Sequence, residues 1–140
     1  MTSKINYLGD LRTEATHLKS NTTIQTDAPT DNNGKGESFS PTDLVATALG
    51  SCMMTIMGIK ARDKGWDLKG TTIAIEKIMA AAPRRIIEIR VTLTFPATAP
   101  SDAADRQLLE NAARTCPVAK SIHPDIAQNI RFIWPDSLFP

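Results

Sequence analysis

The sequence contains few aromatic residues and no run of basic residues. Phenylalanine, tryptophan and tyrosine make up 5% of the 140 residues, and the formal net charge is +1. Proteins that bind nucleic acids or acidic membranes concentrate Lys and Arg on one face, so we expect neither kind of partner here. Hydrophobic residues (41%) and charged residues (22%) occur in the proportions of an ordinary soluble globular protein. The length predicts a single domain over residues 1–140.

The N-terminal residues lack the apolar stretch of a secretory signal peptide, which predicts a cytoplasmic protein. Cysteine is also scarce, with only Cys52 and Cys116 in the chain. In a reducing compartment two such cysteines are free thiols, metal ligands or a redox pair rather than a structural disulfide. A zinc site would have to combine them with His17 and His123, but no two of these four residues have the close spacing of a chelating pair. We therefore expect no metal and no cofactor.

One segment has no charged residue between Asp43 and Lys60. Ser40 is placed to cap a helix there, with Asp43 completing a capping box, and Gly65 is placed to end it. An apolar helix either spans a membrane or forms the buried axis of a domain. The uncharged run is shorter than the roughly 20 residues that a bilayer requires. The pattern thus predicts a buried central helix from Ser40 to Gly65, with no membrane partner.

The remaining segments alternate between strands and helices. Residues 3–26 predict an antiparallel meander of three strands with a two-residue turn at Gly9-Asp10, and residues 27–39 predict a polar loop. Strands are expected over 68–79, 87–95 and 128–134, and helices over 102–114 and 117–122. In the clearest strand, one face is apolar: Ile87, Ile89, Val91, Leu93 and Phe95. This order predicts a two-layer α+β domain in which antiparallel sheets pack on the long helix.

The two cysteines have different predicted surroundings. Cys116 precedes Pro117, where it would cap a short helix, and the positive end of the helix dipole would lower its thiol pKa. Cys52 lies in the middle of the long helix and would need a cation from elsewhere to favour its thiolate. Arg12 is the candidate for that cation, as the one arginine in the N-terminal strands. A cysteine in an apolar helix is usually a small core residue, and that interpretation of Cys52 stays open.

The segment FSPTDLVATALGSCMMTIMG contains Cys52, and CPVAKSI begins 64 residues after that cysteine. These two motifs resemble those of the OsmC/Ohr family of osmotically induced and organic hydroperoxide resistance proteins. The resemblance implies an intertwined α+β homodimer in which the two long central helices pack together and the two active sites form between the subunits. It also implies a thiol peroxidase that reduces organic hydroperoxides.

Carried over by position, Cys52 matches the peroxidatic cysteine and Cys116 the resolving cysteine of the family. The resemblance implies a cycle through sulfenic acid and disulfide, with a small dithiol or lipoylated protein as reductant. It makes Arg12 the stabiliser of the thiolate. Two other functions are compatible with the same fold, namely a non-catalytic protein that binds a small ligand and a redox-sensing stress protein.

The sequence departs from the family at one supporting position. The peroxidases place a glutamate ten residues before the first cysteine, where it orients the arginine, and this chain has Thr42 there. Asp43 is the nearest carboxylate, but one residue turns a helical side chain by about 100°. Glu37, in the preceding loop, is the other carboxylate that could serve.

Overall fold

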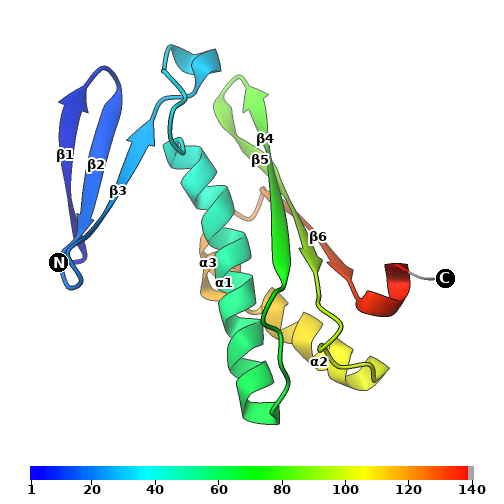
Figure 1. Cartoon of the computed structure of the whole chain (residues 1–140). Helices are drawn as coiled ribbons and strands as arrows, with labels where there is room; N and C mark the ends of the chain where they lie inside the picture. The colour runs from blue at the N-terminus through cyan, green and yellow to red at the C-terminus, as the bar shows by residue number, and fades with distance from the viewer. Residues whose placement is uncertain (139–140) are drawn as a thin grey trace. The chain divides into compact units, whose positions relative to one another are not determined.

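The computed structural model describes residues 1–138 and groups the chain into two compact units, residues 1–45 and 46–140 (Figure 1). Each unit contains one sheet of three strands. The fold class is α+β, as predicted, with a long helix and two small sheets. A single domain over the whole chain remains a prediction.

The N-terminal unit is built on an antiparallel meander in the order β1-β2-β3. Its strands are β1 (Ser3–Gly9), β2 (Arg12–His17) and β3 (Thr22–Asp27). The turn lies at Asp10-Leu11, one residue later than predicted. Both turn residues have positive φ angles, 53° and 63°, as tight hairpin turns require, and the pairing shifts register after Tyr7.

The polar segment between β3 and the long helix is an ordered loop rather than a loose linker. It contains the 3₁₀ helix η1 (Thr30–Asn32) and folds back on itself, since the N–H of Gly36 donates to the Ala28 carbonyl. A Cβ atom at Gly34 would collide with that same carbonyl, so only glycine fits there. The loop thereby brings the chain to Ser40.

Helix α1 (Pro41–Lys64) has the ends that the sequence predicts. The Ser40 hydroxyl accepts the Asp43 N–H at 3.0 Å, and the Asp43 carboxylate accepts the Ser40 N–H at 3.0 Å, which is a complete capping box. Gly65 follows in the left-handed conformation, with φ 75°. The first and last turns of α1 are therefore determined by local sequence.

The C-terminal unit has the order β4-β5-β6 (Figure 1). Strand β4 (Thr72–Ala81) pairs antiparallel with β5 (Arg84–Thr94), and β6 (Ala127–Ile133) pairs parallel with β5. Helices α2 (Ala103–Arg114, capped by Asp102) and α3 (Pro117–Ser121) connect β5 to β6, and the 3₁₀ helix η2 (Pro135–Leu138) follows. We predicted antiparallel sheets, and this is wrong for β6. Helices α2 and α3 return the chain to the starting end of β5, so β6 runs in the same direction as β5.

Two strand predictions also need correction. Strand β4 begins at Thr72 rather than Leu68, because Leu68 accepts the Thr71 N–H in a turn where Gly70 has φ 98°. In β5, Ile86 is buried and Ile87 is 36% exposed, the reverse of the predicted alternation. A bulge beside Met79 leaves Ile87 without a partner in the pairing and turns it away from the core.

One face of the β4-β5-β6 sheet forms the core of the C-terminal unit. Buried side chains of β5 pack in one cluster with buried side chains of α1 and α2, including Ile89, Val91, Leu93, Leu49, Met53, Met57 and Leu109. The two helices therefore cover the same face of the sheet. The opposite face carries Glu88 and Arg90, which form an ion pair at 2.7 Å.

Helix α1 is buried along a stripe rather than all round. The stripe comprises Ala46, Leu49, Gly50, Met53, Met57 and Ala61. Val45 and Ile59, in contrast, are 40% and 44% exposed. Length and composition alone would allow α1 to cross a membrane, but its stripe belongs to the core of the C-terminal unit, so we describe it as a core helix.

Candidate functional site

The structure brings Cys52 and Cys116 together, although 64 residues separate them. Both are free thiols, Cys52 packs against the core cluster that contains Cys116, and the Cys52 side chain is one of the groups that shift the pKa of Cys116. Cys52, in the middle of α1, is partly exposed, whereas Cys116 is fully buried with 0% exposure. Of these two cysteines, only Cys52 therefore has part of its surface exposed to solvent.

Cys116 is the N-cap of α3, as predicted, and its Sγ accepts the Ala119 N–H at 3.3 Å. The predicted lowering of its pKa is wrong. Burial raises the pKa of the Cys116 thiol, the bond from Ala119 lowers it, and the Cys52 side chain raises it again, so that the net shift is upward. Helix α3 has only five residues, and the backbone amides of Val118 and Ala119 do not compensate for the removal of a thiolate from water.

Arg12 lies in β2 and makes a two-pronged ion pair with Asp27. Its Nε donates to Asp27 Oδ1 at 2.7 Å and its Nη2 donates to Oδ2 at 2.8 Å. Nη2 also reaches Glu37 Oε2 at 3.3 Å. The hydrogen bond with Asp27 is the main reason why the pKa of Arg12 is raised above its ordinary value. Arg12, Asp27 and Glu37 therefore form one cluster of charged side chains in the N-terminal unit.

Sequence reasoning missed Asp27. The predicted third strand ended at Thr26, which assigned Asp27 to the loop, whereas β3 includes it and pairs it directly with Arg12. Extending the predicted strand by one residue and aligning the meander would have placed the two charges opposite each other. Asp43, the other candidate carboxylate, forms the capping box with Ser40 described above.

The two histidines make local hydrogen bonds. His17 Nδ1 lies 2.6 Å from Ser20 Oγ, and His123 Nδ1 accepts the Asp125 N–H at 3.0 Å. Within residues 1–138, no group of three or more His, Cys, Asp or Glu side chains is arranged to hold a metal ion.

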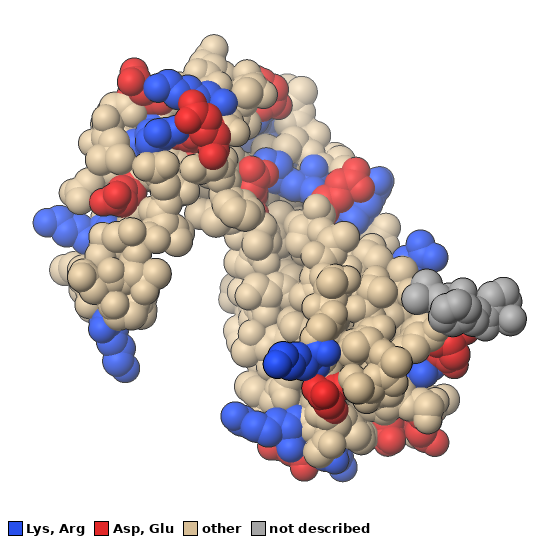
Figure 2. All heavy atoms as spheres, viewed as in Figure 1, with Lys and Arg blue, Asp and Glu red and all other residues tan. Residues whose placement is uncertain are grey.

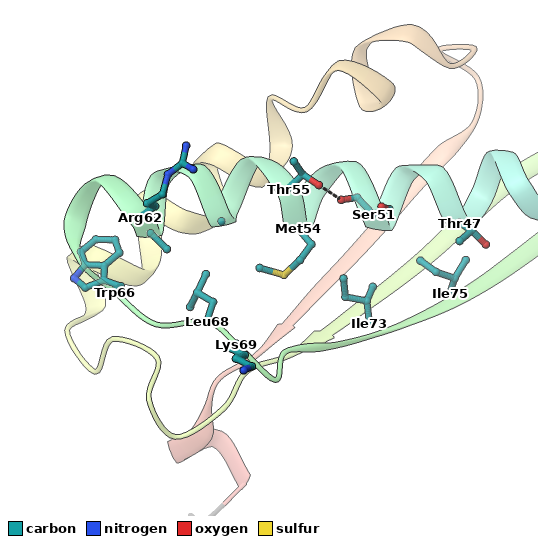
Figure 3. A pocket seen from close by; sticks show the side chains of 12 residues that line it. Thr47, Ser51, Met54, Thr55, Arg62, Trp66, Leu68, Lys69, Ile73 and Ile75 are labelled. Atoms are coloured by element: carbon teal, nitrogen blue, oxygen red, sulfur yellow. Dashed lines mark hydrogen bonds between the residues drawn. The ribbon is translucent and has the colours of Figure 1, made fainter. Parts of the chain in front are cut away.

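A groove of about 710 Å³ runs along α1 in the C-terminal unit (Figure 3). The side chains of Met54, Ile73 and Ile75 face it, and Trp66 and Leu68 lie at one end. Small residues of α1 and the charged side chains of Arg62 and Lys69 also line the groove. Thr55 donates a hydrogen bond to the Ser51 carbonyl at 2.9 Å. Neither Cys52 nor Cys116 is among the described residues that line this groove.

Charged side chains of both signs lie intermingled on the face of the molecule drawn in Figure 2. The ion pairs agree with this picture, since Arg12, Arg90 and Arg106 each have a carboxylate partner. Within each unit, charges of opposite sign therefore lie close together among the described residues of that view.

Comparison with known proteins gives one family and many similar structures. The OsmC-like protein family matches residues 34–131. A solved structure from Psychrobacter arcticus 273-4, provisionally described as an osmotic stress induced and detoxification response protein, is 57% identical in sequence. The alignment covers 94% of this chain and 95% of that one, with a TM-score of 0.90. The search of curated proteins returned no match.

Two more distant structures share the fold. The organic hydroperoxide resistance protein OsmC of Legionella pneumophila is 14% identical with a TM-score of 0.72, over 95% of this chain and 97% of that one. The organic hydroperoxide resistance protein OhrB of Bacillus subtilis is 16% identical with a TM-score of 0.62, over 94% and 98% of the two chains. The family match and the relative from Psychrobacter together show that this chain belongs to the family of OsmC-like proteins.

Proposed function

We propose that this protein is a thiol-dependent peroxidase that reduces organic hydroperoxides in the cytoplasm. The observation that carries the proposal is the pair of adjacent thiols, one accessible and one buried, drawn from distant parts of the chain. Structures that share the fold include proteins named for resistance to organic hydroperoxides. Cytoplasmic dithiols would keep both cysteines reduced between turnovers.

The difference in exposure between the two thiols supports the roles that we propose for them. In the proposed reaction the Cys52 thiolate attacks the terminal oxygen of the hydroperoxide. The O–O bond breaks, Cys52 becomes a sulfenic acid, and the alkoxide leaves as an alcohol after taking a proton. Arg12 is the proposed cation that stabilises the thiolate and the departing oxygen.

Cys116 then resolves the sulfenic acid. Its sulfur attacks the Cys52 sulfur, hydroxide leaves with the thiol proton as water, and a disulfide forms. A small dithiol or a lipoylated protein returns two electrons and two protons to the pair. The raised pKa of Cys116 keeps it a neutral thiol until that step, which avoids two adjacent thiolates.

We also propose that the active form is a homodimer. Ile5 and Ile24 lie directly across the meander from Ala15, on one face, and are 63% and 51% exposed. Tyr7, two residues along β1 on the same face, is 66% exposed. An apolar sheet face of this kind is normally covered, and a second copy of the chain is the occupant that the family resemblance implies.

A stopped-flow peroxidase assay tests the function. Cumene hydroperoxide serves as substrate, dithiothreitol or dihydrolipoamide as reductant, and the wild type runs beside Cys52→Ser and Cys116→Ser. We expect the first variant to lose turnover, and the second to accumulate a sulfenic acid that a dimedone probe captures. An inactive wild type with both reductants would contradict the proposal.

One observation favours a second function. The groove along α1 is large enough for a small apolar ligand and contains neither cysteine in its described lining. If the protein binds such a ligand but does not turn over hydroperoxide, and if both cysteines can be replaced by serine without loss of binding, it is a binding protein on the same fold.

A redox sensor is the other alternative. It would be indicated by a disulfide that changes the binding of a partner protein, again without turnover of hydroperoxide.

A further inference from the structure

Asp27 is the most buried charged side chain in the N-terminal unit, with 1% of its surface exposed. A carboxylate in this position must be fully hydrogen-bonded, and this one is. It accepts two bonds from Arg12, at 2.7 and 2.8 Å, and a third from the Glu37 N–H at 3.0 Å. Arg12 is the main reason why the pKa of Asp27 lies below its ordinary value, and burial opposes that shift.

These bonds fix one edge of the Arg12 guanidinium. The group is planar and rigid, so two parallel bonds through Nε and Nη2 set both its position and its orientation. Nη1 has no hydrogen-bond or ion-pair partner among the residues that the structure describes. The side chain is 24% exposed, so this second edge of the guanidinium can receive an anion.

Glu37 does not hold Arg12 in the same way. Its carboxylate is 63% exposed and makes a single contact of 3.3 Å to Nη2, which is already bonded to Asp27. An exposed single contact of this length contributes little to orientation. The loop segment of Glu37 matters more through its backbone, which donates to Asp27 and so closes the cluster.

We propose that Asp27 is the positioning residue of Arg12, holding the Nε–Nη2 edge so that Nη1 is presented to the anion that reacts. The inference rests on the proposed function, in which that anion is the Cys52 thiolate and then the departing oxygen of the peroxide. It assigns to the end of β3 the task that the family resemblance gives to a glutamate at the position of Thr42 in α1. Asp27 acts through Arg12 and does not touch the reacting atoms.

The test removes the charge of Asp27 and follows two independent readouts. The first is turnover of cumene hydroperoxide, separated into kcat and KM. The second is the pH dependence of Cys52 alkylation by iodoacetamide in a Cys116→Ser background, which reports the thiolate without any peroxide. Circular dichroism and thermal melting check that each variant is folded.

For Asp27→Asn we expect kcat to fall about 100-fold, the loss associated with a small misplacement of a catalytic group. KM should change much less, and the midpoint of Cys52 alkylation should move to higher pH. Glu37→Gln should lower kcat by a smaller factor. Glu14→Gln is the matched control, because Glu14 shares the strand and face of Arg12 and has no described bond; it should behave as wild type.

A double variant keeps the proposal testable if a stranded Arg12 charge prevents Asp27→Asn from folding. Arg12→Ala combined with Asp27→Asn removes both charges, which is the milder change for a buried pair. If Asp27 acts through Arg12, the double variant should be no less active than Arg12→Ala alone. Multiplicative losses would show that Asp27 acts independently, and would overturn the proposal.

The alkylation readout separates this proposal from the proposed function. If the wild type has no peroxidase activity but both Arg12→Ala and Asp27→Asn shift the Cys52 midpoint equally, the positioning role stands and the peroxidase does not. If Arg12→Ala shifts the midpoint and a folded Asp27→Asn does not, Arg12 needs no positioning by Asp27. If Arg12→Ala changes neither readout, Arg12 does not serve Cys52, and the proposal is wrong.

Discussion

The two sheets have equal numbers of strands but very different burial. In the β4-β5-β6 sheet, β5 buries Ile86, Ile89, Val91 and Leu93 beneath α1 and α2. In the β1-β2-β3 sheet, only Thr26 and Asp27 are buried, and the apolar side chains of β1 are exposed. The C-terminal unit therefore has a core of its own, and the N-terminal sheet has none.

The difference in burial means that the C-terminal unit can be stabilised by its own core, whereas the N-terminal sheet cannot. Three antiparallel strands without a packed face are only marginally stable in water, so the N-terminal sheet needs either a covering surface or strong polar interactions. It has the Arg12–Asp27 pair on one face and the bare patch of Ile5, Tyr7 and Ile24 on the other. In our proposal the ion pair serves the peroxidase reaction and the apolar patch serves dimer formation.

The largest expected effect is in the core. Met53→Ala removes a fully buried side chain of α1 and should lower the free energy of unfolding by about 2–5 kcal/mol, through lost burial and the cavity left behind. Urea unfolding at constant m-value measures it. Leu18→Ala, an exposed position of the N-terminal unit outside the proposed dimer face, is the comparison. A loss at Met53 no larger than that at Leu18 would remove the contrast between the two units.

The next effect concerns association. Ile24→Asp places a carboxylate in the centre of the proposed covered face, and we expect the dimer to weaken by about 100-fold or more. Thr23→Asp is the matched control, because the neighbouring residue faces the opposite side of the sheet. Sedimentation velocity over a concentration series measures both. A wild-type monomer, or equal effects of the two variants, would show that this face is not the dimer contact.

A smaller effect is expected where the sequence alone determines structure. Ser40→Ala removes the hydroxyl that caps α1 and leaves the Asp43 N–H without that acceptor. Substitutions of this kind cost about 1 kcal/mol. Asp43→Ala and the double variant complete a cycle that measures the capping box as a unit. Additive losses from the two single variants would mean that the two bonds are independent.

Two glycines of α1 give a matched pair with a still smaller effect. A Cβ at Gly58 meets nothing within 4 Å, so Gly58→Ala should stabilise the helix by about 0.5–1 kcal/mol. A Cβ at Gly50 would lie 2.5 Å from Ile75 Cδ1 and 3.1 Å from Ile73 Cγ2, so Gly50→Ala should give no such gain. Thermal melting compares them. A loss at Gly58 would reveal a surface, such as a second copy, packed closely against it.

The last effect is absent at neutral pH and is expected only in alkali. Because the pKa of Cys116 is raised in the folded protein, its contribution to stability is present below the ordinary thiol value of 9.0 and is lost as pH rises through the raised value. The free energy of unfolding should therefore fall more steeply in alkali for the wild type than for Cys116→Ser. Equal slopes would mean that the buried thiol ionises as freely as an unfolded one.

Local sequence determined the ends of the elements wherever a nearby residue makes the bond. Ser40, Asp43 and Gly65 define α1, and Cys116 caps α3, because caps depend on partners within about four residues. The alternation of apolar residues in β5 identified most of its buried face, because successive side chains of a strand point to opposite sides of the sheet. The bulge at Ile87 escaped prediction because it depends on how β4 pairs with β5.

Tertiary structure alone decided the features on which the proposed function depends. The pairing of Arg12 with Asp27 depends on the register between two strands, and the contact of Cys52 with Cys116 depends on how α3 packs beneath α1. The pKa of Cys116 followed its burial rather than its place at a helix end. Composition and spacing specify which groups are available and which helices and strands form. Only packing determines which groups meet and how much water reaches them, and these two factors decide the chemistry of a charged side chain or a thiol.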